Sequence, residues 1–136
     1  MRKTLLLLLV ANAMSFAAQA ATLSVFAGGG SKESGPATEC KLADPFAVDF
    51  DAAGNAYISE MTNNRLVMVD VSGQLRTFAG TTKKGYTGDG GPAKEATLDG
   101  PHHLLVMKNG DVLVVGGGDV NNQVLASTEL HLAKKH

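Results

Sequence analysis

The run Gly88-Asp89-Gly90-Gly91-Pro92-Ala93 decides the fold, because it lies at the centre of a segment that copies an earlier one. Pro92 lies 56 residues after Pro36, and Gly110 lies 56 residues after Gly54. The matching pairs are Phe26-Ala27-Gly28 with Phe78-Ala79-Gly80, Gly35-Pro36-Ala37 with Gly91-Pro92-Ala93, Leu42 with Leu98, Pro45 with Pro101, and Gly54-Asn55 with Gly110-Asp111. A period of this length is typical of propellers and solenoids. The repeat therefore predicts tandem structural modules and leaves the activity open.

The first twenty residues have the features of a secretory signal peptide. Met1-Arg2-Lys3 gives a positive start, and the apolar run from Leu5 to Val10 is too short to cross a bilayer. Ala18-Gln19-Ala20 matches an Ala-x-Ala cleavage site. We expect cleavage after Ala20, a secreted or periplasmic location, and no membrane contact of the mature chain. An uncleaved anchor and a buried N-terminal helix are the alternatives.

Charge and cysteine content exclude several classes of partner and site. Without Arg2 and Lys3 the chain has 10 basic and 13 acidic residues, a net charge of −3 with neutral histidines. Binding to a nucleic-acid backbone needs many cations on one face, so we expect no nucleic-acid partner. Cys40 is the only cysteine, so no disulfide can form within one molecule. We expect it to be a small loop residue, with intermolecular pairing and a catalytic thiol as alternatives.

Short apolar segments alternate with turn residues along the rest of the chain, which is typical of β-strands. Phe46, Val48 and Phe50 share one face of a period-two pattern and predict a half-buried strand. Hairpin turns are predicted at Gly54, which can take a positive φ, and at the pair Asn109-Gly110. The expected strands are 22–27, 46–51, 56–59, 65–70, 75–79, 104–107, 112–115 and 123–126.

Helical periodicity is almost absent from the sequence. The ranges 36–42 and 92–98 each predict one helical turn, because proline is favoured at a helix start. Leu98 is then expected to fill apolar space between neighbouring sheets. Residues 127–136 are expected to form a frayed, disordered tail.

These motifs resemble the NHL repeat of bacterial secreted proteins. The similarity lies in the ranges 54–58, 63–66, 77–80, 85–93 and 100–102, and extends over nearly all of residues 21–126. In that family each repeat is a four-stranded blade, usually with six blades around a central channel. The resemblance therefore implies an all-β fold, a partial β-propeller of about two four-stranded antiparallel blades.

The chain departs from the NHL pattern in three places. The range 60–66 keeps only one Asn and the Arg of the usual Asp-Thr-Gly-Asn-His-Arg-Ile. The loop 116–123 is two residues longer than its counterpart and has Gln123 in place of the arginine. His103 stands where the family prefers glycine.

Two blades are too few for a closed ring, which needs about three times as many strands. Isolated repeats leave apolar faces without a neighbour, so Val48, Phe50, Val67 and Val69 need a cover. Three explanations stay open: a truncated piece of a longer propeller, a homotrimer that completes a six-bladed ring through strand 22–27 of one chain, and a partly folded product with exposed strand edges.

Four residues are candidates for binding: Asn64, Arg65, His102 and His103. Imidazole binds metals and carries protons near neutral pH. Adjacent residues of a strand point to opposite faces, however, so we expect no metal site at His102-His103. Asn64 and Arg65 either contact a ligand or close a loop and bond to a neighbouring blade.

The glycine-rich loop 85–91 lacks the Lys-Ser/Thr of a phosphate-binding loop and the alternating acids of a calcium loop. We therefore expect a structural role for Asp89, Gly90, Gly91 and Pro92, as for the turn residues Gly54 and Gly110. No catalytic triad can be assembled from the sequence, and no cofactor is expected.

Together these features predict an exported propeller segment, truncated or partial, that acts as a non-catalytic binding or scaffold module for an unknown protein or small molecule. The alternative is a fragment of a metal-dependent propeller enzyme of lactonase or lyase type. That alternative rests on fold analogy alone.

Overall fold

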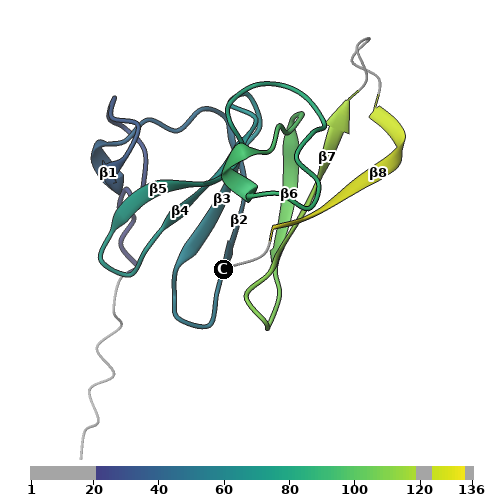
Figure 1. The fold of residues 1–136 in the computed structure, drawn as a ribbon. Coiled ribbons are helices and arrows are strands. Elements are labelled where there is room, and N and C mark those ends of the chain that lie inside the picture. Colours follow the sequence, from purple (N-terminus) through teal and green to yellow (C-terminus); the bar gives the residue numbers. More distant parts are fainter. Residues whose placement is uncertain (1–20, 119–123, 134–136) are drawn as a thin grey trace, which may run out of the picture.

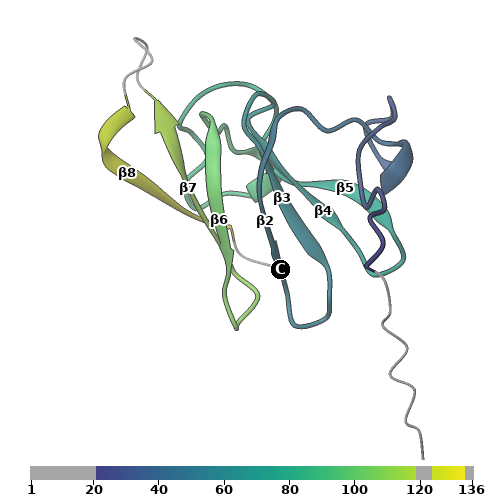
Figure 2. The same ribbon diagram turned by 180° about the vertical axis from the view of Figure 1, so that it is seen from behind.

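The chain is all-β, as expected, and its strands form two antiparallel sheets that stand side by side (Figure 1). The computed structural model describes residues 21–118 and 124–133. Sheet 1 has the strand order β1-β5-β4-β3-β2, and sheet 2 has the order β6-β7-β8. Seen from both sides (Figures 1 and 2), β2 and β6 run next to each other at the centre, whereas β5 and β8 lie far apart.

The strands of sheet 1 are β1 (Gly35–Pro36), β2 (Pro45–Phe50), β3 (Ala56–Glu60), β4 (Arg65–Val69) and β5 (Gln74–Ala79). The strands of sheet 2 are β6 (Pro101–Val106), β7 (Val112–Gly118) and β8 (Val124–Ala133). Two single turns of 3-10 helix, η1 (Ala37–Glu39) and η2 (Ala93–Glu95), follow Pro36 and Pro92. The two helical turns expected from the prolines are therefore confirmed. Strands β2 to β5 form a complete four-stranded meander, and the described part of the second copy contributes three strands.

Several predicted boundaries are wrong. Strand β6 begins three residues earlier than expected, at Pro101, and β7 ends three residues later, at Gly118. Residues 22–27 belong to no strand, because the edge of sheet 1 beside β5 is taken by β1, and Leu23 and Val25 are exposed. The sequence predicts a frayed tail over residues 127–133, but these residues belong to β8. The backbone of β8 pairs with that of β7 from Ala133, opposite Val112, to Val124, opposite Gly118. A hairpin partner supplies the backbone hydrogen bonds that an isolated tail lacks.

The sequence repeat is also a repeat of structure. The Gly28 N–H donates to the Ala37 carbonyl, and the Gly80 N–H donates to the Ala93 carbonyl, both at 2.9 Å. The two hairpin turns match as well, since Gly54 and Gly110 have φ values of 88° and 87°. Each of these glycines donates to the carbonyl three residues earlier, at 3.0 and 2.8 Å. The two copies are therefore built on the same local hydrogen bonds.

Sheet 1 is covered on both faces over β3 and β4, which are buried along their whole length. One face packs against the η1 segment, which contributes Ala37 and the free cysteine Cys40. Val67 and Val69 lie on this face and are buried there, so they have the cover that the sequence demanded. The buried residues of this cluster are Ala37, Cys40, Ala56, Ile58, Val67, Val69 and Leu75.

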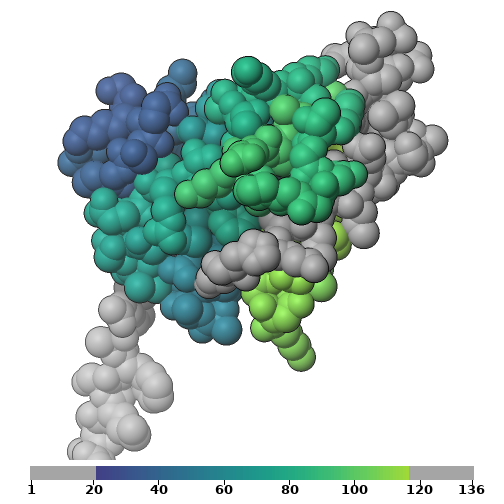
Figure 3. Space-filling model, viewed as in Figure 1, coloured from purple at the N-terminus to yellow at the C-terminus, as the bar shows by residue number. Residues whose placement is uncertain are grey.

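The other face of sheet 1 packs against sheet 2 and the η2 segment. Leu98 is 5% exposed and lies in one buried cluster with residues of both sheets, as the sequence predicted. Figure 3 shows the segment that carries it, in green, spread over the front of the molecule between the sheets. The buried residues of the cluster are Tyr57, Leu66, Met68, Ala79, Leu98, Val112 and Val114. None of the described residues belongs to a helix long and apolar enough to cross a membrane.

Replacing Leu98 tests the contact between the sheets. The Leu98→Ala variant should lose about 2–5 kcal/mol of unfolding free energy, because it leaves a cavity between two sheets that are fixed by their own hydrogen bonds. Urea denaturation followed by circular dichroism measures the loss. Val71→Ala is the control, since Val71 is 74% exposed and should change stability by no more than about 0.5 kcal/mol. Equal effects of the two variants would contradict the packing role of Leu98.

Candidate functional site

The seam between the sheets carries a pair of stacked rings at the start of β2 and β6. Both strands begin with a register shift, between Pro45 and Ala47 in the first copy and between Pro101 and His103 in the second. The residues inside these shifts, Phe46 and His102, lie 56 positions apart. Their ring centroids are 4.6 Å apart and the rings are inclined by 28°. The repeat thus places a ring at the same point of each sheet, and the two rings meet across the seam.

The β3–β4 loop closes the seam above these rings. The Met61 Sδ atom lies 2.9 Å from Nε2 of His102, so the imidazole is held between a thioether and a phenyl ring. His103 is exposed and pairs with Val115 on β7. The structure therefore does not bring the two histidines together.

Asn64 ties the β3–β4 loop to the entry of sheet 2. Its backbone has a φ of 47°, and its Oδ1 atom accepts a hydrogen bond from the Gly100 N–H at 2.9 Å. This contact uses the side chain that the sequence offered as a ligand contact. Asn64 thus joins the two copies of the repeat.

Arg65 is 3% exposed and lies between two acidic side chains. Its Nε atom pairs with the fully buried Glu60, and its Nη1 atom lies 3.1 Å from the exposed carboxylate of Glu33. Glu60 also accepts a hydrogen bond from the Ala43 N–H at 2.6 Å. Arg65 therefore connects β4 to the two segments that enter sheet 1, and it does not face solvent.

The glycine-rich loop is fixed to the segment that carries Leu98. The Gly91 N–H donates to the Gly88 carbonyl at 3.0 Å, and Pro92 caps η2. The Tyr86 hydroxyl donates to Asp99 at 2.5 Å, next to Leu98 in the sequence. These contacts give the loop a structural function; the specific bonds expected of Asp89 stay a prediction.

In the part of the chain that the structure describes, the pKa values of Asp70 and Lys32 are shifted, and both residues lie outside the seam. The Ser72 hydroxyl and the Gln74 amide lower the pKa of Asp70 in the β4–β5 turn. The hydrogen bond and charge of Glu39 raise the pKa of Lys32 near η1. Both groups are at the surface, where they stabilise local turns.

Within the described ranges, the outer face of β2 is an apolar surface without a cover. Phe46, Val48 and Phe50 are 55%, 54% and 54% exposed. Phe46 and Val48, together with Phe26 and Leu42, border an open apolar groove of about 270 Å³. We call the face formed by Phe46, Val48 and Phe50 the β2 face.

The corresponding positions of the second copy are covered. Leu104 and Val106 lie 56 residues after Val48 and Phe50, and both pack, partly buried, against the cluster between the sheets. The equivalent face is therefore covered by a neighbouring sheet on β6 and exposed on β2. An uncovered apolar patch on a structured surface is a typical mark of an interaction site.

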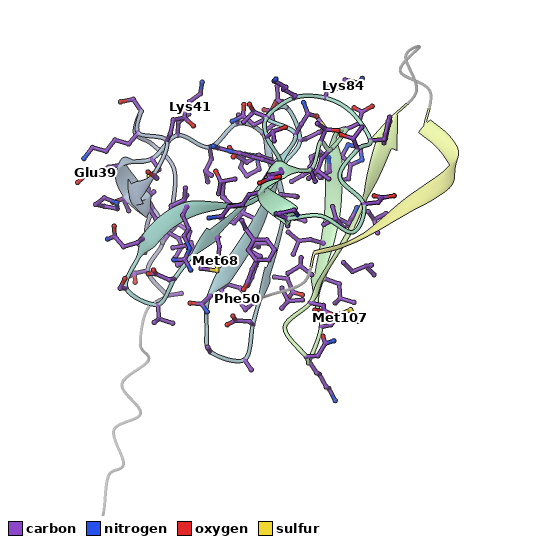
Figure 4. All side chains as sticks on the ribbon, viewed as in Figure 1. Glu39, Lys41, Phe50, Met68, Lys84 and Met107 are labelled. Carbon is purple, nitrogen blue, oxygen red and sulfur yellow. The ribbon has the colours of Figure 1, made fainter. Side chains whose placement is uncertain are left out.

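A second, more polar hollow of about 380 Å³ lies between the two hairpin turns. Phe50 and Met107, labelled in Figure 4, lie at its border. Phe50 is the last residue of β2, and Met107 directly follows β6. Asp51, Lys108 and Asn109 add polar groups. Among the described residues no group of three or more His, Cys, Asp or Glu side chains is placed to hold a metal ion.

Comparison of the chain with protein-family models gives no match, and comparison with curated proteins gives none either. The likeness to NHL repeats therefore stays an expectation drawn from the sequence motifs.

Sequence reasoning missed two contacts across the seam. Met61 was noted only as a departure from a motif, and the stacking of Phe46 on His102 was not expected. The signal for the stacking was present, because each ring follows one of the two equivalent prolines, Pro45 and Pro101. What the pattern lacked was the register shift at the start of each of the two strands.

The two acidic partners of Arg65 give a matched test of the buried network. Glu60→Ala should cost about 3–5 kcal/mol of unfolding free energy, because it leaves a buried guanidinium without its main partner. Glu33→Ala should cost no more than about 1 kcal/mol, because the Glu33 side chain is 72% exposed. Chemical denaturation of both variants measures the difference. A loss for Glu33→Ala as large as that for Glu60→Ala would show that Arg65 is not held as described.

Proposed function

We propose that this chain is an exported, non-catalytic β-propeller segment of NHL type that serves as a binding or scaffold module. The observation that carries the proposal is the β2 face, which is open although its counterpart in the second copy is covered by a sheet. The partner or ligand of the module is a molecule that covers this face.

The energetics of the β2 face favour binding. Burying a whole Val or Phe side chain stabilises by about 1.5–3 kcal/mol, so burying the exposed half of each contributes about 1 kcal/mol. Phe46, Val48 and Phe50 together then offer about 3 kcal/mol to a complex. The surrounding groove adds further apolar area from Phe26 and Leu42.

The contacts of the candidate polar residues support a scaffold rather than a reaction centre. Asn64 and Arg65 hold loops and sheet edges in place, and His102 packs against Met61 and Phe46. The polar groups of the seam thus fix the position of one sheet on the next.

Export can be tested directly on the secreted product. When the chain is expressed with its first twenty residues in a bacterial host, intact-mass spectrometry of the periplasm or medium should find a product that begins at Ala21, because Ala18-Gln19-Ala20 forms the cleavage site. An Ala20→Tyr variant should slow this cleavage, since the site requires a small residue. Accumulation of the uncleaved wild-type chain in the cytoplasm would contradict export.

Catalysis can be tested with a panel of lactones. The purified chain, supplied with divalent metal ions, should hydrolyse them no faster than buffer containing the same ions. The same assays with a chelator serve as the control. Hydrolysis that requires the protein and is lost on metal removal would overturn the non-catalytic proposal in favour of a metal-dependent enzyme.

A further inference from the structure

We propose that the β2 face is covered by a second copy of this chain, which docks head to tail through the outer face of its sheet 2. This inference rests on the proposed function, because it names the occupant of the same face. The contact between the two sheets within one chain shows how one copy of the repeat covers the next.

The packing of sheet 1 on β6 within the chain shows which kind of surface can cover β2. Sheet 1 covers β6 by packing on Leu104 and Val106. The equivalent pair on β2, Val48 and Phe50, has the same apolar character and the same strand position. A face like that of sheet 1 is therefore the natural cover for β2.

Two polar side chains of sheet 1 hold the contact within the chain. The Asp49 carboxylate accepts a hydrogen bond from the Val106 N–H at 2.8 Å. The Ser59 hydroxyl donates to the His102 carbonyl at 3.3 Å. Both side chains lie on the face of sheet 1 that packs against sheet 2.

The outer face of sheet 2 carries the counterparts of this covering face. Leu105 lies opposite Leu113, and His103 lies opposite Val115, so these four residues share one face. Leu105 is 54% exposed, and Leu113 and Val115 are half-buried. At an offset of 56 residues, the counterparts of Asp49, Tyr57 and Ser59 are Leu105, Leu113 and Val115.

The replacements make the outer face of sheet 2 fit an apolar partner. Leucine and valine stand where aspartate and serine hold the contact within the chain. Leu105, Leu113 and Val115 bring no charge to the interface, and neither do the three residues of the β2 face. Burying Val48 and Phe50 against Leu105, Leu113 and Val115 brings no charged side chain into contact with them, whereas a charged partner would do so. His103, opposite Val115, is a polar residue of the same face of sheet 2.

The two surfaces belong to different sheets, so the contact is heterologous and can close only as a ring or continue as a filament. The described part of each chain forms two sheets, so a ring of six blades, as the NHL resemblance implies, contains three copies of that part. Residues 22–27 form no strand in the single chain, and the proposed contact uses face-to-face packing without an exchanged strand.

Light scattering coupled to size-exclusion chromatography tests the proposal with three lysine variants of the purified chain. Val48→Lys places a charge on the β2 face, and Leu105→Lys places one on the outer face of sheet 2. Val71→Lys is the control, because Val71 is 74% exposed and lies in the β4–β5 turn, outside both faces. Phe50→Lys replaces Val48→Lys if circular dichroism shows that the latter does not fold.

The wild-type chain and Val71→Lys should have the mass of a trimer, and Val48→Lys and Leu105→Lys should each have the mass of a monomer. An equimolar mixture of the two monomeric variants should form a dimer of one copy each, because one variant keeps an intact β2 face and the other an intact sheet 2 face.

Two results would overturn the proposal. One is a wild-type chain that stays monomeric at high concentration. The other is an oligomer that Val48→Lys dissociates and Leu105→Lys leaves intact, since this would mean that two β2 faces pack on each other. A monomeric wild-type chain that hydrolyses no lactone would contradict the assembly and leave the proposed non-catalytic function intact. A trimer that hydrolyses lactones would support the assembly and contradict the non-catalytic function.

Discussion

The structure depends on one constraint: a sheet with two apolar faces needs a cover on each of them. Sheet 1 meets this requirement within the chain, because the η1 segment covers one face while sheet 2 and Leu98 cover the other. Burial on both sides keeps β3 and β4 out of water along their whole length. The η1 segment does not cover β2 on this face, where the side chains of Val48 and Phe50 are exposed.

The polar groups of the seam have a task that follows from the same constraint. Apolar packing does not specify the position of one sheet on another, whereas directional hydrogen bonds do. Asp49 and Asn64 supply such bonds to backbone amides of the second copy, at Val106 and Gly100. Glu60 and Arg65 fix the loop from which Asn64 projects. Asn64 and Arg65, two of the candidate binding residues, therefore help to set the position of one copy of the repeat on the other.

Local patterns predicted local structure well. The alternation of Phe46, Val48 and Phe50 located β2, and the glycines of the two copies located the hairpins, because a period of two and a positive φ are properties of a few residues. The role of Leu98 followed from the helical turn predicted over 92–98. The range 22–27 failed because β-propensity does not show which sheet edge is free, and β8 was predicted too short because its partner lies across a hairpin. The ring stack at His102 needed a register shift that no composition signals.

The most direct measurement is disulfide trapping between copies. In a Cys40→Ala background, a chain with both Val48→Cys and Leu105→Cys is oxidised and separated by non-reducing electrophoresis, and the cross-linked peptides are identified by mass spectrometry. The account predicts covalent multimers up to three chains that are joined between positions 48 and 105. Cross-links between two copies of position 48, or a product that stays a single chain, would contradict it.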